Sequence, residues 1–256
     1  MHFTVTADTD VGIAKETNQD SIVVRHGKYF GGEVLMAVIC DGMGGLDKGE
    51  LASATVIRAF LQWFDEELAY ELENPDMQVI GGKWSLMLKE LNVRILEYGQ
   101  ARGISLGTTF TGVLFVGGQY VIVHVGDTRA YRIGKELRQI TADQTFVARE
   151  IERGDMTAEQ AKTDKRKNML LQCVGASDIL EPDVLVGNTE KGVYMLCSDG
   201  FRNEVTEREI FEAFNPVKLV NCETMHSNAR RLIELAKQRQ EMDNISVVLI
   251  RADWER

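Results

Sequence analysis

Short connections between apolar runs rich in Val and Ile constrain this fold most strongly. The runs at 110–116 and 119–125 are separated by two glycines, and those at 130–133 and 137–140 by three residues. Such connections are too short for the crossovers that parallel strands need, so we predict mainly antiparallel pairing. Similar runs predict further strands at 4–10, 21–27, 34–40, 193–198 and 245–250.

Amphipathic helical patterns alternate with these strand blocks. Asp47 stands three residues before Glu50, a capping-box spacing, and predicts the start of a first helix. Its apolar positions recur at helical intervals: Ala52, Val56, Phe60 and Trp63. Pro75 and the pair Gly81-Gly82 predict a break before a second apolar stripe, which comprises Trp84, Leu88, Leu91, Ile95 and Tyr98.

Two more helices are expected near 207–214 and 226–240, and the charge-dense stretch 146–168 is typical of an excursion from the core. Strand blocks and helices without regular βαβ alternation indicate an α+β fold with helices packed on antiparallel sheets. A chain of 256 residues can bury one large core, and we expect a single domain over residues 1–256.

Composition excludes several classes of protein. The formal net charge of -10 argues against nucleic acid as a partner and counts against a metal-dependent nuclease. The four histidines have no zinc-ligand spacing, and no serine lies in a GxSxG motif. The first residues lack a signal-peptide pattern and no apolar run is long enough to span a membrane, so we expect a soluble cytoplasmic protein with no membrane partner.

Several aspartates lie where apolar runs begin or end, namely Asp41, Asp127, Asp199 and Asp243. This placement favours a cluster of carboxylates at one edge of a sheet. Crowded carboxylates are unstable unless protons or a cation neutralise them, and Mg²⁺ and Mn²⁺ prefer oxygen ligands. Taken singly, each Asp-Gly or Gly-Asp pair is more typical of an ordinary turn. The glycine-rich run 41–45 matches neither a dinucleotide nor a phosphate loop.

The ordered set of motifs is more specific than any one of them. It comprises Asn18-Gln19-Asp20, Asp41-Gly42-Met43-Gly44-Gly45, Gly107-Thr108-Thr109, Gly126-Asp127-Thr128-Arg129, Ser198-Asp199-Gly200 and Asp243-Asn244. In order and spacing it resembles the metal-dependent serine/threonine protein phosphatases of type 2C, bacterial branch. The resemblance covers nearly the whole chain. It implies a sandwich of two mainly antiparallel β-sheets flanked by helix pairs (αββα), in agreement with the layout above.

The resemblance also implies a set of metal ligands. Asp41 would bridge two Mn²⁺ or Mg²⁺ ions, and the carbonyl of Gly42 would bind one of them. Asp199 and Asp243 would complete the direct protein ligands, while Asp20 would act through water.

Further residues take their expected roles from the same resemblance. Asp127 matches a position that, with Asp199, supports a third and weaker metal, and residues from about 143 to 168 match a flap beside the site. Lys15 stands where the family usually has an arginine that binds the substrate phosphate. The alternative is that Lys15 is a solvated loop lysine without a role in the site. Met43 replaces the histidine that animal members use as a general acid.

The implied activity is hydrolysis of phosphoserine and phosphothreonine monoesters in proteins by a water that two metals activate, in signalling that opposes a cognate bacterial kinase. We expect a monomer. The alternative is a catalytically weak or inactive member that serves as a phosphoprotein-binding regulatory module, although it would not need three metal carboxylates. Thr108 and Thr109 are expected to satisfy backbone groups. Arg129 could pair with an acidic neighbour or reach the substrate, and we expect the pairing.

Overall fold

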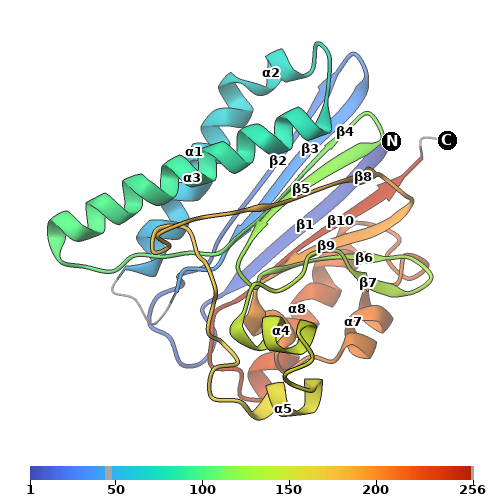
Figure 1. Ribbon diagram of the computed structural model, residues 1–256. Coiled ribbons are helices and arrows are strands. Elements are labelled where there is room, and N and C mark those ends of the chain that lie inside the picture. Colours follow the sequence, from blue (N-terminus) through green and yellow to red (C-terminus); the bar gives the residue numbers. More distant parts are fainter. Residues whose placement is uncertain (44–47, 255–256) are drawn as a thin grey trace.

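The strands of this computed structural model, which describes residues 1–43 and 48–254, form two sheets. The strand order in the first sheet is β1 (His2–Asp10), β10 (Ile245–Asp253), β9 (Gly192–Cys197), β6 (Arg129–Ile133) and β7 (Leu137–Gln139). The order in the second sheet is β2 (Ser21–Tyr29), β3 (Gly32–Cys40), β4 (Phe110–Val116), β5 (Gln119–Val125) and β8 (Asp183–Asn188). All pairs are antiparallel, which confirms the predicted pairing (Figure 1).

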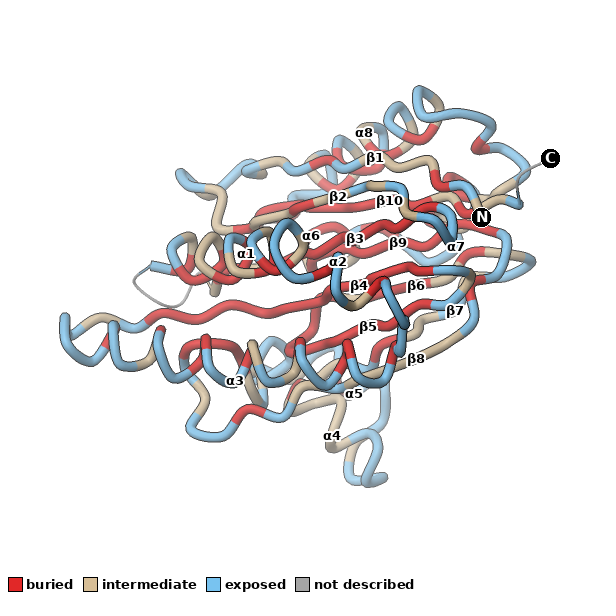
Figure 2. The backbone as a smooth tube through the Cα atoms, turned by 90° about the horizontal axis from the view of Figure 1, so that it is seen from above, coloured by how far each residue is buried: buried red, intermediate tan, exposed pale blue. Residues whose placement is uncertain are grey.

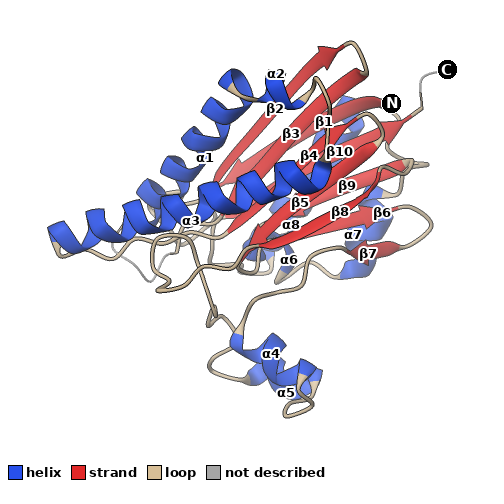
Figure 3. Cartoon of the chain, turned by 45° about the horizontal axis from the view of Figure 1, so that its top comes forward, coloured by secondary structure: helices blue, strands red, loops and turns tan. Residues whose placement is uncertain are grey.

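Helices cover the outer face of each sheet, so the αββα sandwich is confirmed (Figure 3). The second sheet carries α1 (Gly49–Glu66), α2 (Leu68–Glu71) and α3 (Met77–Arg102). The first sheet carries α6 (Asp199–Arg202), α7 (Glu207–Phe214) and α8 (Cys222–Gln238). Two short helices, α4 (Phe146–Glu152) and α5 (Ala158–Thr163), project away from the sandwich. No helix in the described part of the chain is long and apolar enough to cross a membrane.

Apolar side chains from both sheets share one layer between them. Leu35 and Phe115 of the second sheet pack there with Tyr194 and Ile250 of the first. The rings of Phe115 and Tyr194 lie 4.9 Å apart at their centroids. Figure 2 shows the central strands β3, β4, β5, β9 and β10 buried along most of their length, while the helices bury mainly their inward faces. Because each large apolar side chain contributes about 1.5–3 kcal/mol on burial, this layer holds the two sheets in a fixed relative position.

Helix α3 begins earlier than the sequence predicts. Asp76 caps it by accepting a hydrogen bond from the backbone N–H of Gln78 at 2.8 Å, and Gly81-Gly82 lies inside the helix rather than at a break. Tertiary packing explains the first glycine, because a Cβ on Gly81 would overlap Val184 Cγ1 of β8. The predicted cap of α1 at Asp47 lies outside the described residues.

The two glycines of α3 provide a matched pair for a stability test. A Cβ on Gly81 meets Val184 and Val121, whereas one on Gly82 meets nothing within 4 Å. We expect Gly81→Ala to lower the free energy of unfolding by about 1–2 kcal/mol through overpacking, and Gly82→Ala to raise it by about 0.5–1 kcal/mol through helix propensity. Urea unfolding followed by tryptophan fluorescence measures both; equal effects would contradict the packing argument.

Candidate active site

The register of the second sheet brings three aspartates to one edge. Ser21 pairs with Cys40, so Asp20 enters β2 beside the point where Asp41 leaves β3. Strand β5 runs in the same direction as β3 and ends at this edge, just before Asp127. The position of each carboxylate therefore follows from strand pairing.

The first sheet supplies two more aspartates at its corresponding edge. Cys197 pairs with Val247, so β9 leaves the sheet towards Asp199 where β10 enters from Asp243. Gly200 lets the two segments approach closely, because a Cβ there would overlap the carbonyl oxygen of Asn244.

These edges meet around a pocket of about 270 Å³. Its lining residues are Lys15, Asp41, Met43, Thr109, Asp127, Asn168, Leu170, Asp199 and Asp243. The structure thus brings together most of the site residues expected from the sequence. Asp20 and Gly42 are not among the lining residues; both are buried, and the Gly42 N–H donates to the carbonyl of Gln19 at 3.2 Å.

Asp20 is a carboxylate whose charge is poorly compensated by the residues around it. Neither of its carboxylate oxygens has a hydrogen-bond partner, and its side chain is buried. Burial raises its pKa to about 7; the nearby Ser246 and Ser198 side chains oppose this rise, and the charges of Asp199 and Asp243 reinforce it. Oδ1 of Asp199 is likewise buried without a partner. Buried carboxylate oxygens of this kind are costly unless protons or a cation neutralise them.

The other aspartates repel one another as well. Burial, followed by the charges of Asp20 and Asp199, raises the pKa of Asp41 well above its usual range. Burial and Asp199 raise the pKa of Asp127 to about 7. For Asp199, burial also raises the pKa, against a lowering contribution from Arg202. These carboxylates form one interacting group of charges.

An oxygen-only donor set with unpartnered carboxylate oxygens suits a hard divalent cation. Within residues 1–43 and 48–254, no three His, Cys, Asp or Glu side chains converge as a ready-made metal site. The aspartates therefore line the pocket without closing into a ligand shell.

Threonines fix the backbone of the glycine-rich turn. The N–H of Asp41 donates to Thr109 Oγ1 at 2.9 Å, and the Thr109 N–H donates back to the Asp41 carbonyl at 2.9 Å. The Thr108 hydroxyl donates to the same carbonyl at 2.9 Å. The prediction that these hydroxyls satisfy backbone groups is confirmed.

Lys15 lies on a loop that crosses from β1 to β2 over the pocket. The side-chain amide of Asn244 holds this loop by donating to the carbonyl of Val11 at 2.9 Å and accepting from the N–H of Gln19 at 2.9 Å. The Lys15 ammonium faces the pocket and lies 3.1 Å from Asp243 Oδ1. It is therefore placed where an anionic ligand would meet it.

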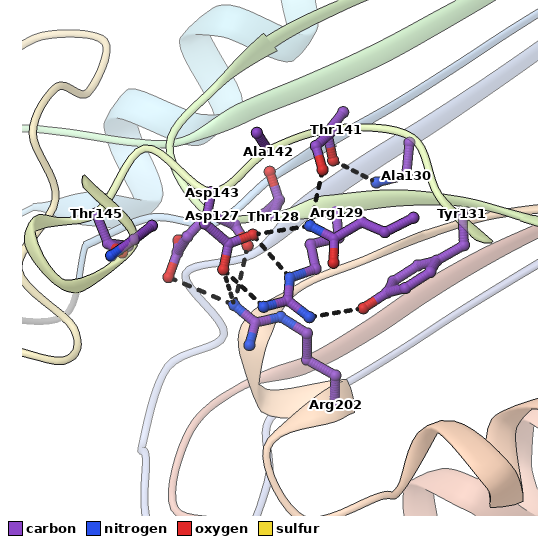
Figure 4. Close-up of polar contacts among 12 residues, drawn as sticks. Asp127, Thr128, Arg129, Ala130, Tyr131, Thr141, Ala142, Asp143, Thr145 and Arg202 are labelled. Carbon is purple, nitrogen blue, oxygen red and sulfur yellow. Dashed lines mark hydrogen bonds and ion pairs between the residues drawn. The ribbon is translucent and has the colours of Figure 1, made fainter. Parts of the chain in front are cut away.

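Two arginines form a network beside Asp127 (Figure 4). Arg129 donates two hydrogen bonds to the carboxylate of Asp143, both at 2.7 Å, which confirms its predicted acidic pairing. Arg202 reaches the carbonyl of Asp127 at 3.1 Å and Asp143 Oδ2 at 3.6 Å. Burial alone would raise the pKa of Asp143, but Arg129 and Arg202 bring it below its usual value.

The sequence does not single out Arg202 and Asp143 as site residues. Arg202 follows Asp199 by three residues in the short helix α6, a spacing that places the two side chains on one face. The Asp199–Arg202 spacing does not by itself reveal the network, because the third member, Asp143, is distant in the sequence.

The profile of the family described as Protein phosphatase 2C matches residues 13–236. This chain belongs to the protein phosphatase 2C family. Among its relatives, the serine/threonine protein phosphatase PstP of Mycobacterium tuberculosis is 32% identical over 246 residues, which are 95% of this chain and 44% of PstP. The chain thus spans less than half the length of that relative.

Solved structures of phosphatases share the fold. The S. agalactiae serine/threonine phosphatase superposes with a TM-score of 0.86 at 27% identity, covering 98% of this chain and 100% of that one. The catalytic domain of PstP, in complex with 2 manganese ions, superposes with a TM-score of 0.75 at 29% identity, covering 97% of each chain. The predicted family and sandwich fold are therefore confirmed for this phosphatase 2C chain.

The raised pKa of Asp20 predicts how the metal-free protein responds to pH. Its value of about 7 exceeds the ordinary 3.8, so the folded state binds this proton more tightly than the unfolded state. The free energy of unfolding should therefore fall as pH rises from about 4 to about 7, by on the order of 3 kcal/mol from this group. Urea unfolding in chelator at pH 5 and 7.5 measures the fall.

Asp20→Asn should reduce this pH dependence by the Asp20 contribution and leave the part that comes from Asp41 and Asp127. Asp178→Asn, an exposed aspartate outside the pocket lining, should leave it unchanged. An unchanged slope in Asp20→Asn would show that other groups carry it.

Proposed function

We propose that this chain is a metal-dependent protein phosphatase that hydrolyses phosphoserine and phosphothreonine monoesters. One observation carries the proposal: Asp41, Asp127, Asp199 and Asp243 line a single pocket that also contains Lys15. The pocket thus combines oxygen donors for cations with one cationic side chain for a phosphate. Membership of the phosphatase 2C family supports this activity rather than a purely binding role. Residues 1–256 would act as one catalytic domain.

The metal ligands are proposed from the same residues. Asp41 and the carbonyl of Gly42, together with Asp199 and Asp243, would hold two Mn²⁺ or Mg²⁺ ions, and Asp20 would contribute through water. The two manganese ions in the PstP catalytic domain favour Mn²⁺. Bound divalent cations lower the pKa of water and offset charge on phosphoryl oxygens. Asp127 would help to hold a third, weaker ion.

Lys15 is the proposed contact for the substrate phosphate. Its ammonium supplies a point charge without the two-pronged geometry of an arginine. Its pairing with Asp243 at 3.1 Å holds the loop lysine at the pocket. The solvated alternative is disfavoured, because the Lys15 side chain is only 30% exposed.

The physiological substrates would be proteins phosphorylated on Ser or Thr, including targets of a cognate bacterial kinase. An acidic chain with net charge -10 does not attract a phosphate dianion by itself. Local positive charge in the pocket, from Lys15 and from cations when they are bound, is needed to reverse that repulsion.

Loss of one carboxylate tests the proposed chemistry. Asp199→Asn should lower kcat/KM for a phosphothreonine peptide by about 100-fold or more in Mn²⁺, because it removes a charged ligand at nearly constant shape. Asp178→Asn serves as the matched control and should retain wild-type turnover. Phosphate release measures both, with chelator expected to abolish it. Full turnover in Asp199→Asn or in chelator would contradict the assignment.

The role of Lys15 is tested separately, through the dependence of the hydrolysis rate on substrate concentration. Lys15→Met should raise KM for an aryl phosphate about tenfold, since it removes a ground-state charge contact, whereas Lys15→Arg should keep KM near or below the wild-type value. Steady-state kinetics in saturating Mn²⁺ measures these effects. Equal KM values for wild type and Lys15→Met would remove Lys15 from the phosphate site.

A further inference from the structure

A second cavity, of about 590 Å³, lies next to the aspartate pocket. Its lining includes residues of α4 and α5, which belong to the flap (residues 143–168). Asp127, Asn168 and Asp199 line both cavities, so the two are adjacent. The volume is within the range of ordinary ligand sites. A polypeptide attached to a phosphate in the first pocket therefore lies within reach of the second.

One wall of this flap cavity is apolar. Val147 and Ile151 of α4 contribute to it, together with Ala158 and Ala161 of α5. Ile151 is 39% exposed, so this wall is accessible to a ligand. Small and aliphatic side chains of this kind suit the backbone and the methylene groups of an extended peptide.

The cationic side chains around the flap cavity differ in whether a carboxylate neutralises their charge. Arg129 and Arg202 are paired with Asp143, and Arg202 also lies 3.7 Å from Asp127 Oδ2. Lys162 and Lys167 line the same cavity, are exposed, and make no ion pair with any described residue. Asp199 belongs to the carboxylate cluster, whose charge bound cations would offset. The two lysines therefore supply the uncompensated positive charge.

We propose that the flap cavity binds the polypeptide beside the phosphorylated residue, and that Lys162 and Lys167 select substrates with an acidic side chain there. This inference rests on the proposed phosphatase function. A chain with net charge -10 repels acidic peptides in general, so a local pair of lysines beside an apolar wall decides whether one is accepted. The substrate class is thus a phosphoprotein segment with Asp or Glu near the phosphorylated residue.

Matched peptides test this selection. Phosphothreonine peptides that differ only by Glu or Gln, placed in turn at each of about three positions on either side, are hydrolysed by the wild type in Mn²⁺. At one or more positions we expect Glu to raise kcat/KM about three- to tenfold over Gln, mainly through KM, as is typical of an exposed charge contact. The double variant Lys162→Met/Lys167→Met should bring this ratio to about one, a loss of the same size.

Lys165→Met is the matched control, because Lys165 lies on the flap between the two lysines but does not line the cavity. It should keep the wild-type Glu/Gln ratio. An absent preference in the wild type, a ratio retained in the double variant, or an equal loss in Lys165→Met would each overturn the selection. Wild-type hydrolysis of a small aryl phosphate is measured in parallel; its absence would overturn the proposed phosphatase function itself.

Discussion

Crowded carboxylates at one edge of two stacked sheets are the constraint on which this structure depends. Burial and mutual repulsion raise the pKa of Asp20, Asp41 and Asp127, so a chain free to relax would separate them. The strands prevent this. A register shift of one residue would turn every buried side chain of a strand to the opposite face. The apolar layers on both sides of each sheet therefore hold the charges together.

Polar side chains complete the support around this cluster. Asn244 holds the loop that carries Lys15, and Thr109 exchanges hydrogen bonds with Asp41. The flap is joined to the same edge, because the Gln144 side chain accepts from the N–H of Gly126 at 2.8 Å while its backbone N–H donates to the Gly126 carbonyl at 2.8 Å. Arg202 bridges Asp127 and the first residue of the flap. The first residues of the flap are therefore held by direct contacts to residues next to the aspartate pocket.

Most elements of the fold were predictable because their signals are local. Residues 110–125 show a strand, two glycines and a strand, and both glycines adopt the positive φ angles that such a hairpin needs. The sequence does not indicate strand β8, because Asp183, Gly187 and Asn188 are poor strand formers. Its glycine is explained only by packing, since a Cβ on Gly187 would lie 2.5 Å from the Tyr120 ring.

The sequence by itself determined most of the strands, the amphipathic faces and the placement of aspartates at strand ends, because strand and helix periods and turn chemistry act over a few residues. The tertiary structure decided that Gly81 lies inside a helix, that Arg202 meets Asp143, and that Lys162 and Lys167 line a cavity adjacent to the aspartate pocket. These relations join residues distant in the chain or depend on which way a side chain points. They arise only when the two sheets pack and set the flap against their common edge.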